Sequence, residues 1–501
     1  MSNYPKDVKL RIIEENYWIG LGKQELDFHQ ALGELIDNCI SATALDDEKD
    51  MIPFKIEIQL EQKGDLVEVN IVDNGIGMSE KELIDEIFSP GGRGNNSGAL
   101  NEHGFGLKHS LCVLTAGNKL DWTIITRDSD ALMRDEIYKV SGPFSLGMKL
   151  ELATKDELTN NNFFNIPQTG TRINFETTFD YFSTIYNRGR VFNTLVDRLM
   201  EHLGVMYREY LKSDFNKLNI YYKNSDEIWE RRKILPIEIC YDSSGCTEYT
   251  IEVWGDRGSA NAIYRVGKLD KEATVNKSTE KPYPLKIYYQ GNQSTQGVDL
   301  VVRGRVIKPH LLTEIWGKER HNTANEFTGE IILTDSRFKT VNNKTALDPN
   351  DLYTINLFHQ LREENQYRIE SVTNKRTEDE YTKIYEIRLK SMFRGSTVNR
   401  NHPIFSGSGV KIDLYLKEKN GDITIHEFKA KTATPIDVYQ LLMYWDGVVK
   451  DENKSPICGI LVANKIPGSV RNIISDANKR NDALGNAYYI ESKTLEDLDL
   501  N

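Results

Sequence analysis

The sequence has 501 residues, of which 39% are hydrophobic and 28% are charged. This composition is that of a folded protein, and it excludes a long disordered chain, a collagen-like repeat and a fibrous protein. The sequence has 63 basic and 75 acidic residues, which gives a net charge of −12. This charge argues against a protein whose whole surface binds nucleic acid, but it is compatible with a local basic groove.

The first 180 residues have the pattern of one α+β domain. Apolar residues at helical spacing predict a helix between residues 25 and 43. Two alternating runs at residues 55–61 and 66–72, separated by a short turn, predict a β-hairpin. The glycine-rich stretch 90–98 predicts a mobile loop. Further strands are expected at residues 121–126 and 171–176.

Three more regions follow along the chain. A long helix is expected at residues 191–211, and alternating runs from 218 to 333 predict a second α+β domain. Charged residues crowd between 361 and 394, which favours a solvated, partly helical connector. The last hundred or so residues alternate strands and helices, as in a compact α/β module. We therefore predict an α+β multidomain protein whose domains span residues 1–180, 181–350, 351–395 and 396–501.

Two motifs of the first domain suit a nucleotide site. Glu34 and Asn38 lie four positions apart, so their side chains share a helix face where a carboxylate can polarise water and an amide oxygen can bind Mg²⁺. Asp73 leaves a buried strand and enters a turn with Gly75 and Gly77. Such a carboxylate can accept a hydrogen bond from a base amine, and the glycines let the backbone approach a ligand.

A third motif places glycines before a helix. Gly104 and Gly106 precede an apolar segment, where backbone N–H groups and the helix dipole favour a phosphate. Lys108 adds a positive charge. Taken alone, the first motif favours a surface pair, the second favours an ordinary β-turn, and the third is a weak signal. Their combination is what indicates a nucleotide site.

In this order and at these distances, the motifs resemble the N, G1 and G2 boxes of the GHKL ATPases. This family covers type II topoisomerases, the heat-shock chaperone, mismatch-repair ATPases and histidine kinases, and segments 31–38 and 103–110 are most similar to its microrchidia (MORC) branch. The resemblance implies a Bergerat fold that binds ATP and Mg²⁺. Glu34 would be the general base, Asn38 a metal ligand, and Asp73 with Thr171 the adenine site. The other implied nucleotide contacts are Gly75, Gly77, Met78, Gly104, Phe105, Gly106, Leu107 and Lys108.

The resemblance extends into the second domain. Residues 338–345 resemble a loop of the ribosomal-S5-like transducer domain, from which Lys344 would reach the γ-phosphate as a catalytic residue. The alternative is a solvated surface lysine. Residues from about 79 to 103 would form a lid over ATP, with Asn101 where the family often has glycine. ATP is expected to join two chains into a homodimer, with the N-terminal arm, about residues 1–24, crossing between them.

The last module carries a second group of residues that suits metal-dependent hydrolysis. Asp413 and Glu427 lie on the two strands of a predicted hairpin, and Lys429 shares a face with Glu427. Two carboxylates suit a hard divalent cation, and a lysine beside them can orient or deprotonate a water. The pattern resembles the PD-(D/E)xK nucleases, and Gln440 with Tyr444 resembles the Gln-xxx-Tyr motif of RecB-like members.

This second resemblance implies a restriction-endonuclease-like domain. Mg²⁺ or Mn²⁺ would be held by Asp413 and Glu427, with Lys429 and Gln440 in catalysis. An ordinary charged hairpin is the alternative. An upstream glutamate often completes such sites, and the sequence leaves Glu380 and Glu386 open.

One basic cluster and the likely compartment complete the predictions. The basic cluster is small, and we interpret it as solvated charge at a strand end rather than as a phosphate-binding site; it consists of Arg303, Arg305 and Lys308. The five cysteines form no Cys-x-x-Cys pair, so a reducing compartment is expected. No apolar run approaches the roughly 18 residues of a membrane span, and no signal peptide is recognisable, so we expect a cytoplasmic protein without membrane contact.

Together the motifs predict an ATP-gated nuclease. ATP would close a homodimer and control a metal-dependent endonuclease acting on DNA, in prokaryotic genome defence or DNA processing, with or without a protein partner from the same operon. The alternative is a MORC-like clamp or chaperone-like machine whose last module binds without cutting. A histidine kinase is disfavoured, because no phosphoacceptor-histidine dimerisation helix is recognisable.

Overall fold

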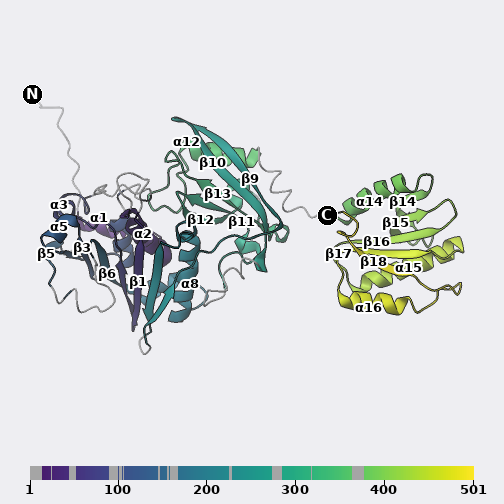
Figure 1. Ribbon diagram of the computed structural model, residues 1–501, viewed down its shortest axis with the longest axis horizontal. Helices are drawn as coiled ribbons and strands as arrows, with labels where there is room; N and C mark the ends of the chain where they lie inside the picture. The colour runs from purple at the N-terminus through teal and green to yellow at the C-terminus, as the bar shows by residue number, and fades with distance from the viewer. Residues whose placement is uncertain are drawn as a thin grey trace, which may run out of the picture. The chain divides into compact units, whose positions relative to one another are not determined.

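The chain forms two compact units, Met1–Thr373 and Asn374–Asn501, each described by itself below (Figure 1). Their boundary falls inside the segment predicted to be a connector. The computed structural model describes residues 14–23, 25–43, 52–89, 100, 104, 106–144, 147–154, 157, 168–224, 228–272, 285–317, 319–363 and 377–500.

An eight-stranded sheet lies at the centre of the first part of unit 1, in the order β5-β4-β3-β6-β2-β1-β7-β8. The predicted hairpin is present as β1 (Lys55–Lys63) and β2 (Leu66–Val72), which pair antiparallel. β6 (Gly170–Thr178) pairs antiparallel with β2. The remaining strands are β3 (Trp122–Arg127), β4 (Tyr138–Gly142), β5 (Lys149–Leu152), β7 (Lys217–Lys223) and β8 (Glu230–Lys233).

The strand β7 belongs to this sheet, although its sequence was grouped with the second domain. It pairs in parallel with β1, with Ile58 opposite Ile220, so its apolar residues complete the first core. The helix expected at 191–211 is interrupted at Tyr207, whose ψ of 18° leaves the helical region, giving α8 (Phe192–Met206) and α9 (Arg208–Leu211). The alternation at 218–222 thus predicts the strand itself, whereas its place in the first sheet depends on the core that its apolar residues complete.

The helix α2 (Phe28–Ser41) positions the first candidate site. It begins with a capping box, in which the backbone N–H of Asp27 donates to Gln30 Oε1 at 3.0 Å. Its apolar residues are buried in the first core, and α2 packs against α4 (Gly106–Leu114). Other helices of this part are α1 (Glu14–Leu21), α3 (Glu80–Asp85), α5 (Ser129–Met133), α7 (Phe179–Phe182) and η2 (Ser183–Ile185).

A five-stranded sheet with its own core forms the rest of unit 1, in the order β12-β11-β13-β10-β9. The helix α12 (Leu352–Glu363) packs on β9, as Figure 1 shows, and Trp316 Nε1 donates to the carbonyl of Leu361 at 2.8 Å. The other elements are β9 (Tyr241–Gly255), β10 (Gly258–Leu269), β11 (Gly297–Val302), β12 (Arg305–Leu311), β13 (Phe327–Leu333), α11 (Thr313–Trp316), η3 (Gln293–Thr295) and η4 (Asn322–Ala324).

Unit 2 is a three-layer α/β module. The sheet order is β14-β15-β16-β17-β18, with β16, β17 and β18 parallel. One face packs against α14 (Glu378–Met392), and the other packs against α15 (Pro435–Glu452) and α16 (Gly468–Ala477). The strands are β14 (Thr397–Pro403), β15 (Lys411–Lys417), β16 (Ile423–Thr432), β17 (Cys458–Lys465) and β18 (Ile490–Thr494).

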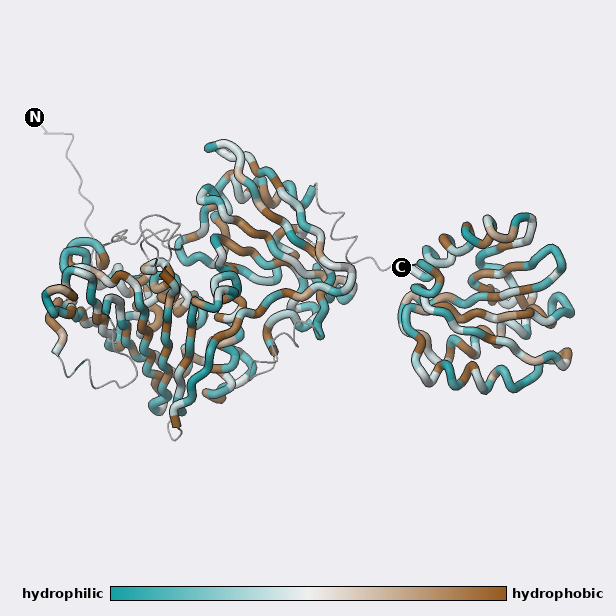
Figure 2. The backbone as a smooth tube through the Cα atoms, viewed as in Figure 1, coloured by the Kyte–Doolittle hydropathy of each residue, from teal (hydrophilic) through white to brown (hydrophobic). Residues whose placement is uncertain are grey.

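Hydrophobic residues concentrate along the strands of both units, as the brown segments of Figure 2 show. This is expected where helices cover a sheet, because apolar surface is removed from water on each covered face. None of the helices in the described part of the chain combines the length and apolar character that crossing a membrane requires.

Candidate functional sites

The first site forms where α2 meets the start of α4. Glu34 and Asn38 occupy the same face of α2, next to Gly106. A Cβ atom at Gly106 would lie 3.0 Å from Glu34 Oε2 and 3.8 Å from Asn38 Nδ2. A side chain here would crowd the Glu34 carboxylate, which would have to shift by a few tenths of an ångström, whereas its contact with Asn38 would be an ordinary one. The structure thus brings residues of two predicted motifs together.

Asp73 follows β2 and is buried. Its Oδ1 accepts the backbone N–H groups of Gly75 at 2.8 Å and Thr171 at 3.1 Å. Burial raises the pKa of Asp73 to about 6, against the lowering effect of these hydrogen bonds. The Thr171 hydroxyl lies 3.0 Å from that of Thr126, which accepts the N–H of Met78 at 2.9 Å. Four predicted nucleotide contacts, Asp73, Gly75, Met78 and Thr171, therefore belong to one hydrogen-bonded chain.

Gly77 has a backbone that favours glycine. Its φ is +72°, and a Cβ atom there would lie 2.1 Å from the carbonyl oxygen of Arg127. A side chain would force the turn after β2 away from β3, and Asp73 would move with it.

Two cations from the second part of unit 1 reach α2. Lys344, in the chain after β13, lies 3.1 Å from Glu34 Oε2 and donates to Asp37 Oδ2 at 2.9 Å. Arg305, the first residue of β12, donates to Glu34 Oε1 at 2.9 Å and also pairs with Asp37. Tyr207 OH donates to Asp37 Oδ1 at 2.9 Å. The result is a buried cluster of four charged groups that joins both sheets of unit 1.

The burial of this cluster shows whether Arg305 and Lys344 are solvated surface charges. The exposed fractions are 1% for Glu34, 0% for Asp37, 3% for Arg305 and 7% for Lys344. Arg305 is therefore not the solvated strand-end charge that the sequence suggested, because Asp37 supplies a buried counter-charge. Lys344 is likewise not a surface lysine. Burial alone would lower the pKa of Lys344, but Asp37 and Glu34 raise it.

Lys108 donates a hydrogen bond to the backbone near the end of α3. Its Nζ donates to the carbonyl oxygen of Ile87 at 2.7 Å, and burial lowers its pKa to about 8. Leu107 packs against the first core, and Gly104 has a φ of +68°. Phe105 lies outside the described residues, as do positions 90–99 and 101–103 of the predicted lid and positions 1–13 and 24 of the predicted arm.

The second site lies in unit 2, where β15 and β16 run side by side. Asp413 Oδ2 accepts the backbone N–H of Phe428 at 2.8 Å, and Lys429 Nζ lies 2.6 Å from Glu427 Oε1. Burial, reinforced by the charge of Asp413, raises the pKa of Glu427 to about 8. Burial also raises the pKa of Asp413. The two carboxyl groups therefore retain a proton between them near neutral pH.

A third carboxylate comes from Glu378, the first residue of α14. Its Oε2 lies 3.7 Å from Lys429 Nζ, and its Oε1 accepts the backbone N–H of Ala430 at 3.3 Å. Glu378 is thus the upstream acid that faces this site.

Neither of the glutamates proposed from the sequence takes that place. Glu380 closes the capping box of α14 with Thr377. Glu386 pairs with Lys390 at 2.7 Å and with Arg400 at 3.0 Å. The Thr-x-x-Glu pattern at 377–380 was the signal available in the sequence, because it marks a helix start and removes Glu380 from the candidates.

The Gln-xxx-Tyr pair lies beside Glu427. Gln440 Nε2 donates to Tyr444 OH at 2.6 Å, and burial followed by the charge of Glu427 raises the pKa of Tyr444. Within the described residues, no three His, Cys, Asp or Glu side chains are arranged to hold a metal ion together. Asp413 and Glu427 have the chemistry of divalent-cation ligands, and Lys429 lies against one of them.

Comparison with known proteins finds a family match over the segment that contains most of the first site. Residues 23–131 match the family described as histidine kinase-, DNA gyrase B-, and HSP90-like ATPase, and this range contains Glu34, Asn38, Asp73 and Gly106. The N-terminal part of the chain is a GHKL ATPase domain.

Two solved structures are similar to larger parts of the chain. The N-terminal domain of a DNA repair protein covers 72% of this chain and 99% of its own, with a TM-score of 0.40 and 13% identity. A repair endonuclease from Pyrococcus abyssi covers 24% of this chain and 47% of its own, with a TM-score of 0.19 and 19% identity. No curated protein matches the sequence.

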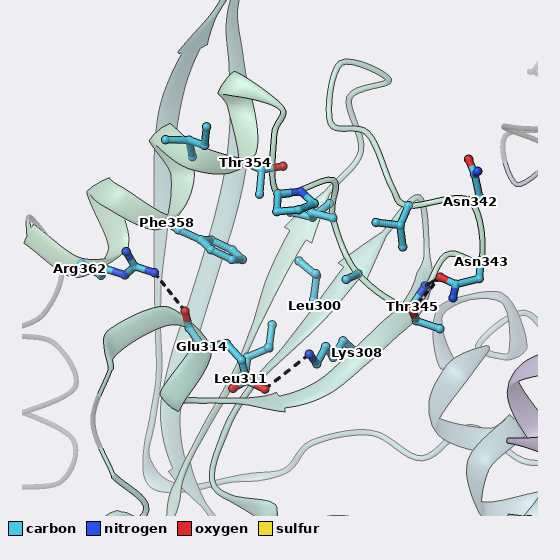
Figure 3. A pocket seen from close by; sticks show the side chains of 15 residues that line it. Leu300, Lys308, Leu311, Glu314, Asn342, Asn343, Thr345, Thr354, Phe358 and Arg362 are labelled. Carbon is cyan, nitrogen blue, oxygen red and sulfur yellow. Dashed lines mark hydrogen bonds and ion pairs between the residues drawn. The ribbon is translucent and has the colours of Figure 1, made fainter. Parts of the chain in front are cut away.

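A cavity of about 750 Å³ lies in the second part of unit 1 (Figure 3). Asn343 and Thr345, on either side of Lys344, line this cavity together with Leu300, Lys308 and Phe358. The Thr345 hydroxyl donates to Asn343 Oδ1 at 2.8 Å, which fixes the turn. Lys344 itself is directed to Glu34, so the cavity is distinct from the charged cluster.

Proposed function

We propose that this chain couples ATP hydrolysis by the GHKL domain to a metal-dependent endonuclease that acts on DNA. The observation that carries the proposal is the buried contact of Lys344 with Glu34. It connects the second sheet to the group that the family resemblance makes the general base. A change at the nucleotide is thereby transmitted to another part of unit 1.

In the ATPase reaction, Glu34 would accept a proton from the attacking water, and Asn38 would bind Mg²⁺ through its amide oxygen. The metal, when bound, neutralises charge on the phosphates. Asp73 and Thr171 would hold the adenine, and Lys344 would approach the γ-phosphate, where a cation stabilises the charge that develops on transfer. ATP binding would favour a homodimer of unit 1.

In unit 2, Asp413 and Glu427 would hold Mg²⁺ or Mn²⁺, which supplies Lewis-acid chemistry when bound. Metal binding requires both carboxyl groups to be deprotonated, so the proton held by the pair is released on binding. Lys429 would then orient the attacking water, and Gln440 would hold Tyr444 beside Glu427. The negative charge of Glu378 keeps Lys429 at the site.

A MORC-like clamp or chaperone-like machine is the second candidate. The observation in its favour is that Lys429 and a retained proton already neutralise the Asp413–Glu427 pair. In that case unit 2 would bind nucleic acid or protein without cutting. The pairing of an ATPase with a nuclease suits prokaryotic genome defence or DNA processing, with or without a partner protein from the same operon.

Cleavage of supercoiled plasmid tests the proposal. The wild-type chain is incubated with Mg²⁺ or Mn²⁺, with and without ATP, beside Glu34→Ala and Lys429→Ala. We expect Lys429→Ala to abolish cleavage and Glu34→Ala to change its dependence on ATP. Metal-independent DNA binding with ATP hydrolysis but no cleavage would favour the clamp instead.

A further inference from the structure

Both oxygens of Glu34 face cations. Arg305 donates to Oε1 at 2.9 Å, and Lys344 lies 3.1 Å from Oε2. Both cations therefore lie at the group that the proposed function makes the general base. A move of Lys344 to a phosphate would leave Arg305 as the only cation of the cluster beside Glu34.

Asp37 connects the same two cations. It lies one helical turn after Glu34, accepts from Lys344 at 2.9 Å and pairs with Arg305. The sequence motifs assign it no role. Its other oxygen accepts from Tyr207 OH, so the carboxylate is held from both sides.

The charges of the cluster explain what Asp37 does. Glu34 and Asp37 carry two negative charges, and Arg305 and Lys344 carry two positive ones, so the buried group is neutral. If Lys344 moved to a phosphate, two carboxylates would share one guanidinium, leaving one uncompensated negative charge. Such a charge is costly in a buried place.

We propose that Asp37 competes with the γ-phosphate of ATP for Lys344, and that Arg305 is the positioning residue that holds Asp37 and Glu34 in place when Lys344 moves. The inference rests on the proposed ATPase function and adds a control on nucleotide affinity. Asp37 makes the movement of Lys344 away from the cluster unfavourable. Only a nucleotide whose γ-phosphate can bind Lys344 therefore draws this side chain away.

Three substitutions test the competition by the sign of their effects. Asp37→Asn removes a charge but keeps an oxygen for Tyr207, so departure of Lys344 leaves a neutral Glu34–Arg305 pair. We expect the Kd for the β,γ-imido analogue of ATP to fall by about tenfold, within the range of coupling energies between sites. Arg305→Met is expected to raise this Kd by a similar factor. Arg305→Lys keeps the charge and is expected to restore most of the affinity.

The measurement is isothermal titration calorimetry of the full chain with Mg²⁺. Thermal unfolding is recorded for each variant to verify folding, and the exposed Asp180→Asn serves as a matched control with unchanged Kd. If Asp37→Asn fails to fold, Tyr207→Phe replaces it. This change removes a hydrogen bond from Asp37 and keeps its charge, so Lys344 is held more tightly and Kd rises severalfold.

A double mutant isolates the role of Lys344. In a Lys344→Met background, Asp37→Asn should no longer tighten binding, because the competing cation is gone. Equal tightening in both backgrounds, or weaker binding by Asp37→Asn alone, overturns the inference. These outcomes differ from failure of the proposed ATPase, in which the wild-type chain would bind no nucleotide at all.

Discussion

The two candidate sites are assembled in different ways. In unit 1, Arg305 meets Glu34 across 271 positions of sequence, and Lys344 meets Asp37 across 307. In unit 2, Asp413 meets Phe428 across 15 positions, within one hairpin. A site built from distant segments depends on how two sheets pack, whereas a site within a hairpin depends on the register of two strands.

The sites also differ in what balances their buried carboxylates. Two protein cations neutralise Glu34 and Asp37 in unit 1. In unit 2, Lys429 and a retained proton balance Asp413 and Glu427. A proton leaves more readily than an arginine side chain, so the second site is the better suited to exchange its counter-charge for a metal ion. Under the proposed function, the two sites would respond to different ligands, ATP in unit 1 and a divalent cation in unit 2.

Separate loss of the two activities is the strongest expected effect. Glu34→Gln removes the proposed base, so ATP hydrolysis should fall by about 10² to 10⁴-fold while nucleotide binding persists. Lys429→Ala should leave hydrolysis within about twofold, because Lys429 belongs to the other compact unit. Steady-state ATPase assays and nucleotide titrations check both. Full hydrolysis by Glu34→Gln would show that another group activates the water.

A buried ion network should be far more costly to break than an exposed one. Arg208 lies 2.8 Å from Asp299 and 2.5 Å from Glu330, and its side chain is 1% exposed. Arg208→Met removes the buried cation that the two carboxylates share, and the hydrogen bond of Tyr289 to Asp299 and the pairing of Arg265 with Glu330 replace it only in part. This should cost about 3–5 kcal/mol of unfolding free energy.

The matched control lies in unit 2. The Arg400 side chain is 25% exposed and pairs with Asp379 and Glu386. Arg400→Met should cost less than about 1 kcal/mol. Urea denaturation of the full chain gives both values. Equal losses of unfolding free energy in the two variants would mean that the buried Arg208 network stabilises the contact of α9 with the second sheet no more than an exposed ion pair would.

The proton held by Glu427 should make unit 2 less stable as pH rises. In the unfolded chain the group titrates near 4.5, but the folded pKa is about 8, so the folded state binds more protons between these values. Stability is therefore highest below about pH 4.5 with respect to this group, falls up to about pH 8 and is then level. The loss is on the order of a few kcal/mol.

Scanning calorimetry at several pH values, with Glu427→Gln as the control, measures this effect. The substitution removes the titrating group, so the transition of unit 2 should lose most of its pH dependence in this window. Mn²⁺ should raise the transition temperature most at pH 8, where the carboxylates are closest to deprotonated. A slope that persists in Glu427→Gln would assign the dependence to another group.

The features that the sequence predicts correctly are local ones. The capping and spacing of α2, the β1–β2 hairpin and the Asp413–Glu427 pair depend on neighbouring residues, so periodicity and turn residues predict them. Glu378 was missed because the exact start of α14 decides which glutamate faces Lys429, and helix boundaries are the least predictable feature of a helix.

Contacts between segments that are distant in the sequence could not be predicted. β7 joins the first sheet because its apolar residues complete that core, which its own alternation does not reveal. Asp37 and Arg305 have ordinary surface residue types, and only the packing of β12 against α2 makes them a buried pair. No spacing rule connects residues so far apart in the sequence.

The smallest expected effect concerns the proposed recognition of adenine by Asp73. Its pKa is about 6, so the carboxylate is mostly charged at pH 7.5 and mostly protonated at pH 5.5. Protonation removes an acceptor for the adenine amine, so the Kd for ATP should rise by about 2- to 10-fold as pH falls through 6, which corresponds to one hydrogen bond.

GTP, which presents a carbonyl at the position of the adenine amine, should bind weakly at pH 7.5, and its affinity relative to that of ATP should rise at pH 5.5. Nucleotide titrations at the two pH values measure this crossover. A constant ATP-to-GTP ratio would mean that Asp73 holds the turn through Gly75 and Thr171 without contacting the base.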